Sequence, residues 1–124
     1  MRDYNEAIDF STRILDFRLL EDTDLGGGKR WVRVAATNGA ALLLVKAVGD
    51  EQLTAVGNQA GGRVGFFLHT DDFHRDYHCY RSRGVVFEGE PRRESYGTVA
   101  VFADLAGNRW DLIEMDAGVD GALE

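Results

Sequence analysis

Asp111 places a carboxylate in a segment whose sequence otherwise predicts two strands of a sheet. Residues 96–114 predict an apolar strand, a turn at 105–108 and a second strand in which Trp110 and Leu112 alternate with Asp111 and Ile113. Trp110 and Leu112 form the packing face, so the Asp111 side chain lies on the opposite face. A carboxylate on an apolar face is costly unless it has a partner. Asp111 is therefore the first candidate for chemistry.

His69 is the second candidate. Strand parity within the apolar segment 63–70 gives it the same face as Phe67. With Asp111, and with Glu114 as a further oxygen donor, His69 could form a non-standard metal site or an acid–base pair. The alternative, which we favour, is a solvated or hydrogen-bonded histidine at the rim of the sheet.

Three further side chains have the right chemistry but lack partners in the sequence. His74 and His78 have the i, i+4 spacing that can bind zinc on a helix, but no third ligand lies nearby. Cys79 follows on the same helix without a base oriented to activate it. We expect a solvated helix face and an unreactive thiol.

A mostly apolar cleft surface is expected if Val32 and Val34 pack beneath the first helix, because Trp31 and Arg33 then face away from it. Trp31 could stack on a planar ligand, and Arg33 could pair with Asp111 or with a ligand anion. The other expected ligand-binding residues are Leu43, Phe67, Ile113, Arg93 and Tyr96. The alternatives are that the apolar residues fill a closed core and that Arg93 and Tyr96 belong to a solvated loop.

The elements that position these residues occur twice. A helix from Asp3 and strands at 17–23, 30–36 and 41–47 are followed by a strand at 63–70, a helix capped by residues 71–72, a strand at 85–88, a charged loop at 89–95 and the closing hairpin. A shift of 68 positions superposes Asp3 on Asp71, Asp16 on Gly84 and Leu43 on Asp111. No counterpart of 63–70 precedes the first copy, so we expect either that the true N-terminus is longer or that this copy is one strand short, with an exposed edge that needs cover.

The expected boundaries follow from this repeat. The first module spans 1–48, a small and polar linker with at most one helical turn spans 49–62, the second module spans 63–116, and a fraying tail spans 117–124. Asp16 takes the place of a helix-terminating glycine, for which a left-handed Asp is the next-best residue.

Composition limits the classes of partner. Apolar residues make up 44% of the 124 positions, which is enough for a core. The net charge of −7 argues against nucleic acid and anionic membranes as partners. No apolar run approaches the roughly 20 residues that span a bilayer, no signal peptide is evident, and the lone Cys79 favours a reducing compartment. We expect a cytoplasmic protein.

The run V-F-A-D-L-A-G-N-R-W-D-L-I-E at 101–114 resembles the closing hairpin of the vicinal oxygen chelate superfamily, which includes glyoxalases, bleomycin-resistance proteins and extradiol dioxygenases. Residues 3–10 and 14–17 are similar to the family's first helix and the start of the next strand. The resemblance implies an α+β fold in which two βαβββ modules form a curved mixed sheet with a cleft and with helices on the convex side.

The resemblance also implies four positions for a divalent metal, one on the first and last strands of each module. Asp111 is a competent ligand at one of them, whereas Leu43 and Gly65 occupy two others and the fourth falls in the absent strand. Since a catalytic zinc usually has three protein ligands, we expect no cofactor, with a divalent metal as the alternative.

The expected function is therefore metal-independent binding of a small molecule in an apolar cleft, of the bleomycin-resistance type, by a homodimer. One alternative is a glyoxalase-like lyase or extradiol-type dioxygenase with a non-standard site around His69 and Asp111. The other is a regulatory or structural module without catalysis.

Overall fold

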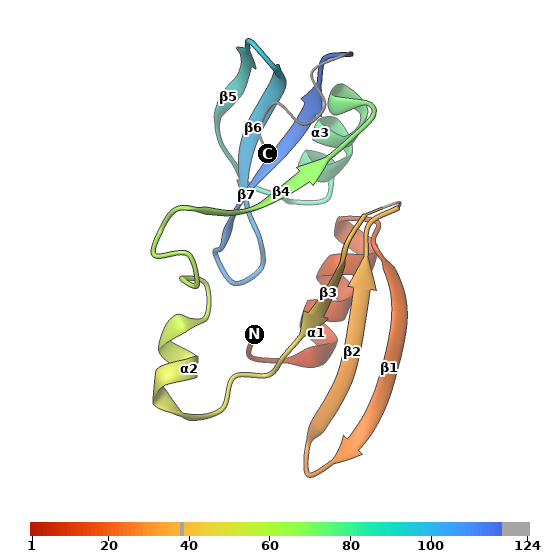
Figure 1. Ribbon diagram of the computed structural model, residues 1–124, viewed down its shortest axis with the longest axis vertical. Helices are drawn as coiled ribbons and strands as arrows, with labels where there is room; N and C mark the ends of the chain where they lie inside the picture. Colours follow the sequence, from red (N-terminus) through yellow and green to blue (C-terminus); the bar gives the residue numbers. More distant parts are fainter. Residues whose placement is uncertain (38, 118–124) are drawn as a thin grey trace. The chain divides into compact units, whose positions relative to one another are not determined.

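The computed structural model describes residues 1–37 and 39–117 and divides into two compact units, Met1–Asn58 and Gln59–Glu124 (Figure 1). Each unit has one sheet and is described by itself. The division falls inside the segment expected to separate two modules, and the expected fraying of the tail concerns residues that lie almost wholly outside the described ones. Within the described ranges, no helix is long and apolar enough to cross a membrane.

The helical part of the first unit ends as its sequence predicts. Helix α1 (Tyr4–Asp9) begins at Asp3, whose carboxylate accepts a hydrogen bond from the Glu6 N–H at 2.9 Å. It continues into η1 (Phe10–Ile14), a π-helical stretch that the sequence did not predict. Asp16 then adopts φ 61°, the left-handed conformation that Asp tolerates better than most residues.

The first sheet is an antiparallel hairpin with a third strand. Its order is β1 (Arg18–Gly26), β2 (Lys29–Ala35) and β3 (Ala41–Leu44). Helix α1 contacts β2, and Val32 and Val34 are completely buried. Beyond β3, the Met1 amino group donates to the Val45 carbonyl at 2.9 Å and the Met1 carbonyl accepts from the Ala47 N–H at 2.8 Å. The burial of Val32 and Val34 thus identifies the face of the sheet that α1 covers, and the residues between them point to the outward face.

The connecting segment is more ordered than expected. Helix α2 spans Gly49–Ala55, seven residues, so the expectation of at most one helical turn was wrong. Asp50 and Glu51 lie in its first turn, where negative charge is favourable, and the Gln52 side chain accepts from the Val48 N–H at 2.8 Å. These interactions stabilise the first turn of α2.

The second unit contains the complete strand–helix–three-strand arrangement. Its elements are β4 (Val64–His69), α3 (Phe73–Ser82), β5 (Phe87–Glu94), β6 (Gly97–Ala103) and β7 (Arg109–Met115). The sheet order is β4-β7-β6-β5, with β4 and β7 parallel and the other pairs antiparallel. The α+β class is therefore confirmed, with one sheet in each unit.

Strand β5 corrects a second expectation. Residues 89–95 were predicted to form a charged loop, but β5 continues to Glu94. Its pairing with β6 is irregular between Glu88 and Arg92. This irregular stretch contains Pro91 and also Gly89, whose φ is 71°. An edge strand with a bulge tolerates a proline that cannot donate a ladder hydrogen bond.

The core of the second unit lies between α3 and the sheet (Figure 1), where α3 contacts β7. Phe73, Tyr77 and Tyr80 of the helix are buried, as are Phe102 and Trp110 of the sheet. The Tyr80 and Phe102 ring centroids are 6.0 Å apart, and those of Phe102 and Trp110 are 5.7 Å apart. This packing fixes the inner face of β7.

The turn between β6 and β7 is organised by one carboxylate. Asp104 Oδ1 accepts hydrogen bonds from the backbone N–H groups of Ala106, Gly107 and Asn108 at 2.9–3.0 Å. Its Oδ2 accepts from Trp110 Nε1 at 3.0 Å. The turn and the first core residue of β7 are thus joined by a single side chain.

Candidate functional site

The outward face of the first sheet presents an oriented tryptophan. Trp31 is 40% exposed although its neighbour Val32 is fully buried, because alternate residues of β2 point to opposite faces. The Trp31 Nε1–H donates to Glu21 Oε1 at 3.1 Å, and Arg33 Nε donates to the same oxygen at 3.0 Å. One carboxylate therefore restrains the indole and neutralises the neighbouring guanidinium.

Glu21 was not predicted as a site residue. The hairpin register pairs it with Arg33, but the β1–β2 ladder is irregular between Leu19 and Glu21 and again between Asp24 and Gly26. Counting back from the glycine-rich loop by strict alternation therefore gives the wrong partner. Three acidic residues in β1 were visible in the sequence, but nothing there indicated which of them would reach Trp31.

Aliphatic side chains accompany Trp31 in this unit. Leu43 of β3 lies opposite Arg33 in the register and is 45% exposed, and Val45 is 54% exposed. A partly exposed indole beside exposed aliphatic groups, with the neighbouring Arg33 already paired with Glu21, can take the flat face of an apolar ligand.

The outward face of the second sheet contains Asp111. In the register, Asp111 lies between Phe67 of β4 and Val101 of β6. Its Oδ1 is buried and has no hydrogen-bond partner among the described residues, whereas the residue as a whole is half-buried. Burial raises the pKa of the Asp111 carboxyl above its ordinary value, against the opposing effect of Arg92 and Arg109.

Both of those arginines are engaged elsewhere. Arg109 forms an ion pair with Glu88 at 2.7 Å and also donates to the Gly62 carbonyl at 3.1 Å. Arg92 forms an ion pair with Glu94 at 3.4 Å. Each of these guanidinium groups thus has a carboxylate partner, whereas Asp111 forms no ion pair with the described part of the chain.

The structure does not join the three acid–base candidates of the second unit. His69 lies level with Ile113 in the register and is exposed, and no hydrogen bond connects it to Asp111 within the described ranges. Glu114 instead accepts a hydrogen bond from the Phe73 N–H at 2.7 Å and so caps α3. The His69 and Asp111 side chains share a face without forming a pair.

The expected apolar contacts of this unit differ in accessibility. Phe67 is 55% exposed, but Ile113 is buried, with only 1% of its surface exposed. Phe67 is therefore available to a ligand on this face, and Ile113 is part of the packing.

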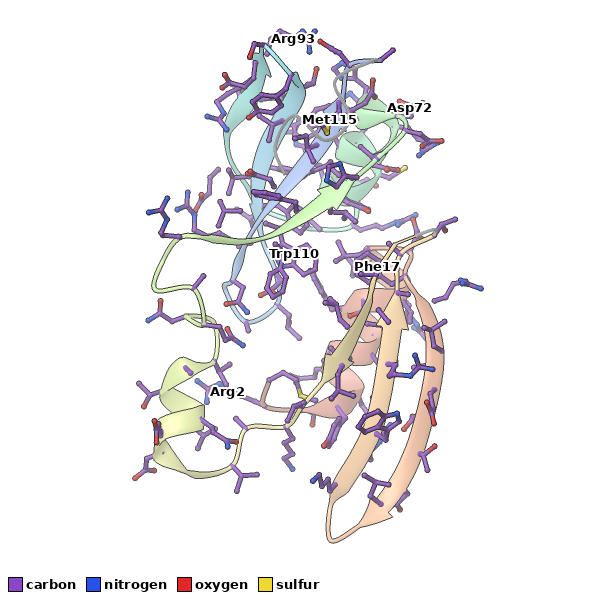
Figure 2. All side chains as sticks on the ribbon, in the orientation of Figure 1. Arg2, Phe17, Asp72, Arg93, Trp110 and Met115 are labelled. Atoms are coloured by element: carbon purple, nitrogen blue, oxygen red, sulfur yellow. The ribbon has the colours of Figure 1, made fainter. Side chains whose placement is uncertain are left out.

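Arg93 and Tyr96, two further expected ligand contacts, lie in the β5–β6 hairpin of the second unit. Arg93 is paired with Thr98 in the register, and Figure 2 shows it at the end of the sheet away from Trp110. Its guanidinium forms an ion pair with Asp116, whose backbone N–H donates to the Tyr96 carbonyl at 2.8 Å. The Arg93 guanidinium, an expected ligand contact, is therefore already paired within the unit.

The donor set does not fit a metal ion of the usual kind. No group of three or more His, Cys, Asp or Glu side chains that could hold a metal occurs in the described part of the chain. The register neighbours of Asp111 are a phenylalanine and a valine, which cannot coordinate. His74 and His78 are exposed on α3 with ring centroids 6.3 Å apart, and Cys79 is free.

Comparison with known proteins identifies the relatives of this chain. A family model described as the glyoxalase/bleomycin resistance protein/dioxygenase superfamily matches residues 1–112. An uncharacterized protein of Shewanella frigidimarina is 50% identical over 119 residues, covering 94% of this chain and 88% of its own.

Solved structures are similar over most of their length. The crystal structure of UcmS2 has a TM-score of 0.76 at 29% identity and covers 90% of this chain and 89% of its own. That of TnmS3, an antibiotic binding protein from Streptomyces sp. CB03234, has a TM-score of 0.71 at 31% identity and covers 93% and 89%.

Proposed function

Because the chain belongs to the glyoxalase/bleomycin resistance protein/dioxygenase superfamily, we propose that it is a small-molecule-binding protein that holds an aromatic ligand without a metal. The observation that carries this proposal is Trp31, whose indole is 40% exposed yet held by Glu21. An aromatic side chain that is both open and restrained binds a planar ligand at a low cost in conformational entropy.

Two further observations support the proposal. The similar structure of TnmS3 is that of an antibiotic binding protein. Among the described residues, Asp111 has no neighbouring donors of the kind that a catalytic metal needs, so binding is a simpler role than lyase or dioxygenase chemistry for these residues.

The test is calorimetric titration of the protein with 2-naphthylmethanol, a neutral probe with a planar apolar body. We expect binding, and we expect Trp31→Ala to weaken it by about tenfold or more while lowering the free energy of unfolding by only about 1 kcal/mol, since the side chain is partly open. Leu25→Ala, which removes another exposed apolar side chain of the same unit, is the matched control. Unchanged affinity in Trp31→Ala would remove Trp31 from the site.

Elemental analysis of protein purified without an affinity tag tests the metal-dependent alternative. Stoichiometric divalent metal that disappears in Asp111→Ala would favour a lyase or dioxygenase over ligand binding. The proposal also includes a homodimer, as is common for ligand-binding members of the superfamily, and sedimentation equilibrium tests this association state.

A further inference from the structure

The unpaired Asp111 carboxylate gives the second sheet a chemical preference. We infer that Asp111 and Phe67 form a recognition site for a protonated amine attached to an apolar or aromatic body. This inference concerns the second unit alone; it rests on the proposed function, that the chain binds small molecules, and names a class of ligand.

The first step concerns the carboxylate itself. Asp111 Oδ1 has no exposed surface and no hydrogen-bond partner in the described ranges, while the residue keeps part of its surface open. The negative charge is shared by both oxygens, so a cation that approaches the open side stabilises the whole group. A cation on the open side therefore stabilises the charge of the carboxylate without reaching the buried Oδ1 itself.

The second step concerns the surrounding charges. Arg109 is paired with Glu88 and Arg92 with Glu94, so each pair is neutral as a whole, although both arginines also favour the charged form of Asp111. The Asp111 carboxylate is left in excess. Such a face attracts a cation and disfavours an anion of the same shape.

The third step concerns the aromatic neighbour. Phe67 is the direct register partner of Asp111 on β4 and is 55% exposed. Its ring offers an apolar surface to the ligand body and a π face to the ammonium group. The two residues together therefore select an apolar ligand with a cationic head.

The experiment compares three probes of one shape at pH 7: 2-naphthylmethylamine, which is protonated, 2-naphthylmethanol, which is neutral, and 2-naphthoate, which is an anion. We expect the wild-type protein to bind the amine about tenfold or more tightly than the alcohol, and the anion least tightly. Asp111→Asn, which keeps the shape and removes the charge, should bind the amine and the alcohol equally. Asp50→Asn on the exposed helix α2 controls for the change in net charge.

A second measurement needs no variant. Lowering the pH protonates the Asp111 carboxyl but not the amine, so the preference of the wild-type protein for the amine should fall. The inference is overturned if the wild type binds the amine and the alcohol equally, or if the preference for the amine survives in Asp111→Asn. In either case, binding of the alcohol that depends on Trp31 would still support the proposed function. Failure of all three probes to bind refutes both.

Discussion

Removal of the Glu21 carboxylate is the most direct test of how Trp31 is positioned. In Glu21→Ala, the indole Nε1 loses its acceptor at 3.1 Å and Arg33 loses its partner at 3.0 Å. Both side chains of the Glu21–Arg33 pair are 40% exposed, so the free energy of unfolding should fall by no more than about 1 kcal/mol. The larger effect should be on binding, because Trp31 must then be ordered by the ligand.

Ordering a mobile side chain costs about 0.5–1.5 kcal/mol, so the dissociation constant for 2-naphthylmethanol should rise about two- to tenfold. Glu21→Gln retains an oxygen that can accept from the indole, and it should therefore preserve most of the affinity although it loses the ion pair with Arg33. Glu51→Ala, at an exposed position of α2, is the control for loss of a negative charge.

Calorimetry gives the dissociation constants, and the indole N–H signals in a ¹⁵N–¹H spectrum report position directly. The chain has two tryptophans, so Trp31 is assigned by comparison with Trp31→Phe. We expect its indole signal to move and its exchange with solvent to accelerate in Glu21→Ala but much less in Glu21→Gln. An unchanged signal and affinity in Glu21→Ala would refute the positioning role, and equal losses in both variants would assign the effect to charge.

Three other perturbations have defined outcomes. Gly97→Ala should lower the free energy of unfolding by more than about 3 kcal/mol in urea denaturation, because its Cβ would lie 2.1 Å from the Glu114 carbonyl oxygen; a loss below 1 kcal/mol would contradict the close approach of β6 and β7. Glu114→Ala should cost about 1–2 kcal/mol by removing the acceptor for the Phe73 N–H, and Glu114→Gln should cost less. Asp111→Asn should stabilise the protein by about 1 kcal/mol at pH 7. Since burial raises the folded-state pKa of Asp111, the folded chain binds this proton more tightly than the unfolded chain, and the advantage of the Asn variant should shrink as the pH falls through that raised pKa; an advantage independent of pH would contradict the burial of a charged group.

Period-two alternation was sufficient to predict the faces of the strands. It gave the outward direction of Trp31 from the burial of Val32 and Val34, and it placed Asp111 opposite Trp110 and Leu112. These predictions depend only on which way successive side chains point, and a packed helix on one face makes the choice unambiguous.

Interactions between strands were beyond the reach of the sequence. The pairing of Arg109 with Glu88, which leaves Asp111 alone, joins residues 21 positions apart on two different strands. The role of Glu21 depends on an irregular register, and the extension of β5 depends on a bulge that accommodates Pro91. In each case the missing information was the alignment of one strand with another, which local patterns do not contain.

The Asp104 side chain affects which face of β7 carries the Asp111 carboxylate. By bonding three backbone amides of the turn and also Trp110 Nε1, it ties the length of the loop to the phase of the strand that follows. A slip of β7 by one residue would exchange its two sides and drive the carboxylate of Asp111 in among the rings beneath α3. The turn residue Asp104 thus helps to determine on which face of β7 the Asp111 carboxylate lies, although Asp104 itself need not contact a ligand.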